Sequence, residues 1–176
     1  MSRCGPRLVS STQPRLVSSR KHRFEPDCDR REAVAVDETK RDVEDEDVYL
    51  RAAVDGDTFE ALHVDVSPGR SRLDALLFLK EVLKYCRGQP TVLADRGEWY
   101  DWPLDILDCE GKRETWGDRS LIEAWFGVLK YRTMLFRHRV PHYSTRESTE
   151  SWLTAFAALH NALLQSQHPL DLTVTL

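Results

Sequence analysis

The stretch DRSLIEAWFGVLKYR, residues 118–132, has the pattern of an amphipathic helix around which the other motifs of the chain can be placed. Its apolar side chains recur at helical spacing and predict a buried stripe. Glu123, Gly127 and Lys130 fall at i, i+4 and i+7, so a carboxylate and a cation share one face beside that stripe. A structural alternative remains, because Ser120 and Glu123 also fit the S-x-x-E capping box of a helix start.

Length and composition indicate one globular domain. The chain has 176 residues, 41% of them hydrophobic and 31% charged, which is typical of neither a disordered nor a membrane protein. No apolar run reaches the roughly 20 residues that span a bilayer, and the N-terminus lacks the apolar segment of a signal peptide. The four widely spaced cysteines are expected to be reduced thiols. We therefore expect a cytoplasmic protein with no membrane partner.

Charge is segregated along the chain. Residues 1–31 carry eight Lys and Arg against three Asp and Glu, residues 32–66 carry three against twelve, and residues 111–146 carry eight against three. Basic segments beside an acidic centre suit a protein that holds metal ions and contacts phosphate, although charge runs are more often solvated surfaces.

Residues 1–32 are predicted to be a basic, disordered leader. The hexapeptide PRLVSS occurs twice in this segment, at residues 6–11 and 14–19, in a context rich in Ser, Arg and Pro without a period of 2 or 3.6. Two copies are too few for a repeat architecture.

From residue 33 the pattern changes to a mixed sheet flanked by helices. Strands are expected at residues 33–40, 48–55, 58–66 and 91–94, with a weak strand in 109–116 and a loop at 41–47. Helices are expected at residues 72–85, within 99–108, at 118–132 and at 144–164. Asp55 and Asp57 are expected to form a tight turn rather than to bind a ligand. The core-facing stripe of the first helix is predicted to contain Leu73, Leu76, Leu77, Leu79 and Leu83.

Two acids follow apolar strands that are expected to be adjacent. Asp37 and Asp95 would leave the same edge of the sheet, where ligands of α/β sheets commonly bind, and Glu123 could complete the group from its helix. Three converging carboxylates need a cation, and oxygen ligands favour Mg²⁺ or Mn²⁺. Taken singly, each acid also has a structural explanation as a cap or turn residue. The aromatic residues that follow Asp95 could stack on a base, or pack in the core or loop: Trp99, Tyr100 and Trp102.

Several motifs together resemble the catalytic core of insertion-sequence transposases of the IS-six type, which carry a DDE motif. The resemblance covers about residues 33–164 and rests on VAVDETK, VYLRAAVDGDT, VLADRGEWY, DRSLIEAWFGVLKYRT and STESWLTAFAALHN. It implies a ribonuclease-H-like fold of the integrase kind, with three antiparallel strands followed by parallel strands. It also implies that two metal ions are held by Asp37, Asp95 and Glu123.

The resemblance further implies a DNA-binding surface. The basic residue two turns after the family's glutamate corresponds to Lys130, and Arg132 and Arg137 are expected to contact DNA phosphates as well. Arg119 and Thr39 match further motif positions, and Arg119 is included among the expected DNA-binding residues.

The expected function is metal-dependent strand cleavage and strand transfer of an insertion sequence, catalysed by residues 33–165 and followed by a tail at 166–176. The expected partners are transposon ends and target DNA, bound by a homodimer or higher oligomer at the nucleoid. The family's helix-turn-helix region has no counterpart in the leader, which suggests an N-terminally truncated copy. Two alternatives stay open: a non-catalytic remnant that binds DNA or a partner, and a structure-specific nuclease of the same fold.

Overall fold

The computed structural model of the protein describes residues 24–44, 46–94, 98–113, 119–132 and 144–167. Within them, a five-stranded sheet has the order β4 (Ala61–Ser67), β3 (Glu46–Asp55), β2 (Ala33–Val43), β6 (Thr91–Ala94) and β7 (Gly111–Arg113). Strands β2, β3 and β4 are antiparallel neighbours, whereas β6 and β7 continue the sheet in parallel. The predicted arrangement of three antiparallel strands followed by parallel strands is confirmed.

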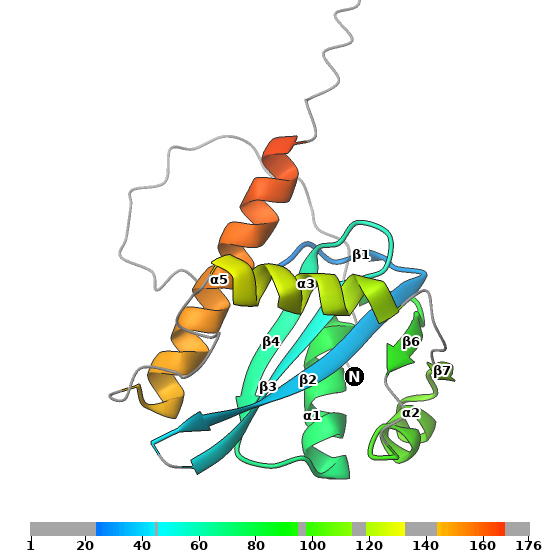
Figure 1. The fold of residues 1–176 in the computed structure, drawn as a ribbon. Helices are drawn as coiled ribbons and strands as arrows, with labels where there is room; N and C mark the ends of the chain where they lie inside the picture. Colours follow the sequence, from blue (N-terminus) through cyan, green and yellow to red (C-terminus); the bar gives the residue numbers. More distant parts are fainter. Residues whose placement is uncertain (1–23, 45, 95–97, 114–118, 133–143, 168–176) are drawn as a thin grey trace, which may run out of the picture.

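Two pairs of helices cover the two faces of the sheet (Figure 1). One face packs against α1 (Arg72–Val82), its extension η1 (Leu83–Tyr85) and α2 (Asp101–Leu107). The other packs against α3 (Arg119–Arg132) and α5 (Arg146–Gln167). The strands supply both cores because successive side chains point to opposite faces: Val34 and Val36 belong to the α1 side, and Ala35 to the α3 side.

The hairpin that joins β2 to β3 differs from the expected loop at residues 41–47. Strand β2 continues to Val43, which pairs with Glu46, so two residues connect the strands. Val43 and Val48 are buried at 4% and 3% exposure. The loop prediction was wrong because a run of charges hid this alternation, in which isolated valines face the core and charged residues face water.

Helix α1 begins with a capping box, in which Ser71 accepts from the backbone N–H of Asp74 and the carboxylate of Asp74 accepts from that of Ser71. Its buried stripe includes Leu76 and Leu79, as predicted, together with Ala75, Phe78 and Val82. Leu73 and Leu77 are instead 58% and 54% exposed. They lie on the opposite side of the helix from Ala75 and Phe78, which the sheet contacts.

The folded part begins before the predicted boundary at residue 33. Strand β1 (Asp29–Arg30) pairs in parallel with β5 (Cys86–Arg87), and the next residue, Arg31, is buried. Cys28 is disulfide-bonded, contrary to the expectation of reduced thiols, whereas Cys86 and Cys109 are free. No helix in the described ranges has the length and apolar character needed to cross a membrane.

Candidate active site

Asp37 lies within β2, on the face of the sheet that α3 covers. It was expected to follow the end of its strand, but pairing with β3 continues β2 six residues further, to Val43. Ala35 packs in the core beneath α3 and Val36 in the core beneath α1, so the alternation of the strand directs Asp37 toward α3. Asp37 is half-buried, and its Oδ1 accepts a hydrogen bond from the backbone N–H of Glu38 at 2.8 Å. Strand β2 therefore fixes the backbone position of Asp37 and directs its carboxylate to the face that α3 covers.

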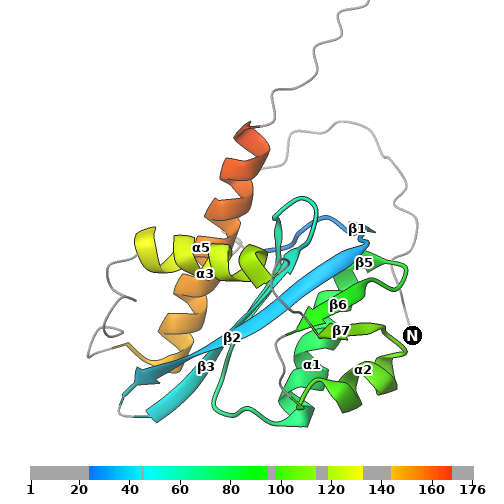
Figure 2. The same cartoon turned by 45° about the vertical axis from the view of Figure 1, so that its right-hand side comes forward.

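Strand β6 runs beside β2 in parallel, as Figure 2 shows. Its last described residue, Ala94, pairs with Val36, and Leu93 belongs to the α3-side core. Asp95, the second predicted metal ligand, directly follows Ala94 in the chain but lies outside the described residues. The described pairing therefore ends one residue before Asp37 on β2 and one residue before Asp95 in the sequence.

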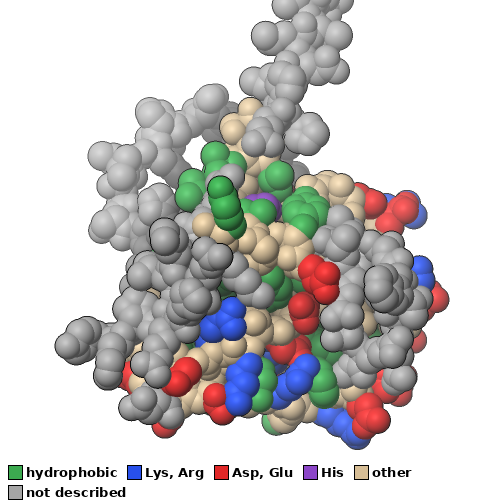
Figure 3. All heavy atoms as spheres, viewed as in Figure 1, with side chains coloured by type: hydrophobic (Ala, Val, Ile, Leu, Met, Phe, Trp, Pro, Cys, Tyr) green, Lys and Arg blue, Asp and Glu red, His purple; other side chains and the backbone are tan. Residues whose placement is uncertain are grey.

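Helix α3 carries Glu123 onto this same face. The buried side chains Ile122, Trp125 and Leu129 pack the helix against β2 and β3. Glu123 is exposed and lies on the flank of that buried stripe, with Gly127 one turn later. Figure 1 shows the first turns of α3 on the side of β2 and β6 and its last turns beside α5. Acidic side chains gather between the start of α3 and β2 in Figure 3.

The capping-box alternative for Glu123 does not fit the helix boundary. Helix α3 starts at Arg119, so Ser120 is its second residue rather than the N-cap that precedes the first turn. Glu123 is therefore a surface residue of the second turn. The backbone positions of Arg119, Lys130 and Arg132 also lie in α3, but their side chains are not described, and Arg137 lies outside the described residues.

Among the residues that the structure describes, no three His, Cys, Asp or Glu side chains form a group able to hold a metal ion. The predicted ligand set has only two described members, Asp37 and Glu123, which the structure places on one face of the sheet on elements that pack together. Both are carboxylates, the donor type that Mg²⁺ and Mn²⁺ prefer, so the residues present fit such an ion.

A buried polar cluster on the opposite face was not predicted. Glu38 points toward α1, accepts a hydrogen bond from the hydroxyl of Tyr100 at 3.0 Å, and pairs with Nε of Arg70. The packing interpretation of Tyr100 is confirmed, because its side chain is only 3% exposed, and burial raises the pKa of its phenol well above the ordinary value. No sequence signal links positions 38 and 100. Strand alternation does predict that Glu38 and Asp37 lie on opposite faces of the sheet.

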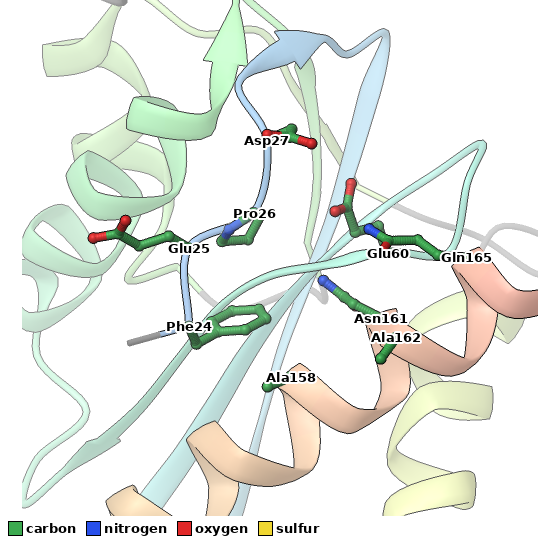
Figure 4. A pocket seen from close by; sticks show the side chains of 9 residues that line it. All are labelled: Phe24, Glu25, Pro26, Asp27, Glu60, Ala158, Asn161, Ala162 and Gln165. Atoms are coloured by element: carbon green, nitrogen blue, oxygen red, sulfur yellow. The ribbon is translucent and has the colours of Figure 1, made fainter. Parts of the chain in front are cut away.

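A cavity of about 190 Å³ lies away from both described acids, between residues 24–27, Glu60 and α5 (Figure 4). Two of its polar side chains are already engaged: Glu60 pairs with Arg31, and Asn161 bonds the backbone of Ala61. The cavity therefore lies between the N-terminal segment and the rest of the domain.

Asp55 forms the expected turn, since its Oδ1 accepts from the backbone N–H groups of Asp57 and Thr58.

No family model matches the chain. It is 39% identical over 137 residues to the uncharacterized protein MJ0017 of Methanocaldococcus jannaschii, covering 78% of this chain and 64% of the relative. It is 36% identical over 56 residues to the uncharacterized protein aq_aa24 of Aquifex aeolicus, covering 32% of this chain and 46% of that relative. The chain thus spans less than two thirds of each of these relatives.

Similar solved structures are retroviral integrases. A simian T-cell lymphotropic virus intasome in complex with PP2A regulatory subunit B56 gamma has a TM-score of 0.54 at 15% identity, over 83% of this chain and 53% of that chain. The HTLV-2 integrase catalytic core in complex with magnesium has a TM-score of 0.50 at 12% sequence identity, over 77% of this chain and 84% of that chain. The BIV integrase catalytic core has a TM-score of 0.51 at 13% sequence identity, over 77% of this chain and 95% of that chain. The chain therefore has the ribonuclease-H-like fold of integrase catalytic cores.

Proposed function

We propose that the chain is a DNA transposase that cleaves and transfers DNA strands with the help of two Mg²⁺ or Mn²⁺ ions. The observation that carries this proposal is the placement of Asp37 and Glu123 on one face of an integrase-like sheet, beside the strand that leads into Asp95. The catalytic domain is taken as residues 33–165.

Covalent geometry supports a site that includes Asp95. The Cα atom of Asp95 lies within about 3.8 Å of that of Ala94, and neighbouring strands are about 4.8 Å apart. Asp37 directly follows Val36 and Asp95 directly follows Ala94, and Val36 and Ala94 are partners in the register of β2 with β6.

Each residue then has a role that its chemistry suits. Asp37, Asp95 and Glu123 would together hold the metal ions. When bound, such ions activate a water or a 3′-hydroxyl and stabilise the leaving oxygen of a phosphodiester. Lys130 lies two turns after Glu123 on the same flank of α3, where its cation would contact a DNA phosphate. Arg119, Arg132 and Arg137 are proposed as further phosphate contacts.

The proposed partners are transposon ends, target DNA and a second copy of the chain, in the cytoplasm at the nucleoid. Large apolar side chains exposed at the surface of α1 and α2 support the proposal of self-association. Leu73 and Leu77 lie one turn apart on α1, and Trp102 and Ile106 lie one turn apart on α2, all four between 41% and 58% exposed. Such surfaces commonly mark protein–protein contacts.

The test is Mn²⁺-dependent nicking and joining of DNA by the purified protein. Asp37→Asn, Asp95→Asn and Glu123→Gln should each lower nicking by about 10²–10³-fold, the usual loss when a charge-stabilising group is removed. Glu147→Gln, which neutralises an exposed acid in the first turn of α5, is the matched control. Equal nicking by wild type and the Asp95→Asn variant would refute the assignment. Cut DNA without joined DNA would favour the structure-specific nuclease, and binding without either product the non-catalytic remnant.

A further inference from the structure

Arg41 is a cationic residue of β2 on the same face of the sheet as Asp37. Alternation along the strand places Asp37, Thr39 and Arg41 on one face. Val43, two residues further, belongs to the core on the α3 side, which fixes that direction. Four residues of strand span about 13 Å, which is the axial length of about four base pairs of DNA. Arg41 therefore lies within reach of a DNA segment that is bound at Asp37.

The hairpin carries Arg41 away from the part of the sheet that α3 covers. Figure 1 and Figure 2 both show β2 and β3 running out from beneath α3 to the end of the hairpin. Figure 3 shows Lys and Arg side chains on this surface, next to the acidic side chains near the start of α3. Helix α3 therefore leaves this end of the hairpin uncovered.

The guanidinium of Arg41 has donors without acceptors. Its Nη1 donates to the carbonyl oxygen of Lys40 at 2.7 Å, whereas its Nε is buried and has no hydrogen-bond partner. Its Nη2 makes no hydrogen bond to a residue that the structure describes. Nε and Nη2 form one edge of the guanidinium, and such an edge binds two oxygens of a phosphate side by side.

Arg41 also lacks an ion pair within the described ranges. Glu46, the partner of Val43 in the hairpin register, lies on the same face but forms no ion pair with Arg41. Burial lowers the pKa of the Arg41 guanidinium, and no carboxylate is near enough to oppose that shift. An arginine nevertheless stays charged at neutral pH, and a partly buried charge is costly unless it is paired. Lys40 differs, because it lies on the other face and pairs with Asp47.

We propose that Arg41 binds a phosphate of the DNA backbone through Nε and Nη2, on the hairpin side of Asp37. This inference rests on the proposed function. A phosphate supplies both the negative charge and the paired oxygens that this edge of the guanidinium has not found in the described part of the chain. Such a contact sets the position of the DNA relative to Asp37 but does not read its sequence.

Arg41→Met tests the contact, because it removes the charge and keeps an unbranched apolar stem beside Val48. The measurement is the fluorescence anisotropy of labelled duplex DNA, in EDTA so that no strand is cut, at several salt concentrations. Affinity should fall about tenfold or more, the usual effect of losing a charge-assisted hydrogen bond. The loss should be equal on two unrelated sequences. The slope of log affinity against log salt should fall in magnitude by about 0.9, the value for one phosphate contact.

Lys40→Met is the matched control, since the same substitution removes the same charge from the neighbouring residue on the other face. It should change DNA affinity by less than about twofold, because salt screens a charge that touches no phosphate. Arg41→Lys keeps the charge and should keep the salt slope of the wild type. It should still bind DNA less tightly, because lysine lacks the two-donor edge.

Three results would overturn the contact while leaving the proposed function intact: wild-type affinity in Arg41→Met, an equal loss in Lys40→Met, or a loss with an unchanged salt slope. DNA binding that depends on Arg41, without metal-dependent nicking, would keep the contact and refute the transposase. A wild-type protein that binds no DNA would refute both.

Discussion

Asn161 holds the backbone of Ala61 with both ends of its carboxamide. The N–H of Ala61 donates to Oδ1 and Nδ2 donates to the carbonyl oxygen of Ala61, both at 2.9 Å. Ala61 is the first residue of the edge strand β4, and Asn161 is buried in α5. This pair joins α5 to the sheet at the point where β4 has no strand on its outer side among the described residues.

Asn161→Ala should lower the free energy of unfolding by about 2–4 kcal/mol, because two buried backbone groups lose their partners. Asn161→Asp should also destabilise, since a carboxylate accepts from the N–H but repels the carbonyl oxygen. Urea denaturation at neutral pH measures both. Wild-type stability in the alanine variant would show that water replaces the carboxamide without cost.

Asp55→Asn should destabilise the protein by about 3–5 kcal/mol at pH 7, the usual cost of breaking a buried ion pair. Arg31 donates to Oδ2 of Asp55 at 2.9 Å and to Glu60 at 2.6 Å, with Arg31 and Asp55 almost fully buried. Lys40→Met is the matched control, because the Lys40–Asp47 pair is more than half exposed and should contribute little.

The effect of Asp55 should also depend on pH. Burial raises the pKa of its carboxyl, but hydrogen bonds from Thr58, Asp57 and Arg31 outweigh burial and lower the pKa below its ordinary value of 3.8. The stabilisation is therefore present above pH 3.8 and is lost as the pH falls through the lower native pKa. Denaturation curves at pH 7 and pH 3 should show a smaller difference between wild type and Asp55→Asn at the lower pH. A difference that grows on acidification would contradict this sign.

Gly127→Ala should raise the free energy of unfolding by about 0.5–1 kcal/mol. Gly127 is exposed within α3, and a Cβ atom there would meet nothing within 4 Å. Alanine loses less backbone entropy in a helix than glycine. Ala124→Gly, at another exposed position of α3, should lower stability by a similar amount. Thermal or urea denaturation checks both signs.

Leu77→Lys should leave stability within about 0.5 kcal/mol of wild type, because the side chain is 54% exposed. If α1 meets a second copy of the chain, the same substitution should shift sedimentation toward the monomer, since it puts a charge into an apolar contact. Leu159→Lys, at a 57% exposed position of α5, is the control. Equal self-association of both variants and wild type would place the contact elsewhere.

Strong local sequence patterns were sufficient to predict most of the helices and strands of the fold. The apolar runs of β2 and β6, and the 3.6-residue period of α3, predicted these elements within a few residues. For the predicted site, the sequence indicated the strand that carries Asp37 and the helix that carries Glu123, but not that Asp37 lies in the interior of its strand. The positions of Asp37, Asp95 and Glu123 predicted a metal site, and the resemblance to DDE transposases implied the role of each residue.

The errors have a common physical origin in packing between distant residues. Helix α1 has leucines on nearly every side, so periodicity alone could not show that Phe78 faces the sheet and Leu77 faces water. Strand β2 continues past Lys40 because it pairs with β3, and the charged residues of this segment hide that pairing from a local reading of the sequence. The bond of Glu38 to Tyr100 joins positions 62 residues apart and leaves no local signal.

The exposure of Glu123 beside the buried Trp125 gives the two positions different evolutionary constraints. Trp125 is completely buried and contacts Phe126, Phe156 and His160, so any copy of this gene that still encodes a folded protein must keep a side chain of its shape. Glu123 lies at the surface, where substitutions usually cost less stability than at a buried position, so the proposed chemistry adds a constraint there that folding alone does not. Among copies of the gene, drift at position 123 with retention of position 125 would mark lineages in which the proposed catalysis is no longer selected although folding still is.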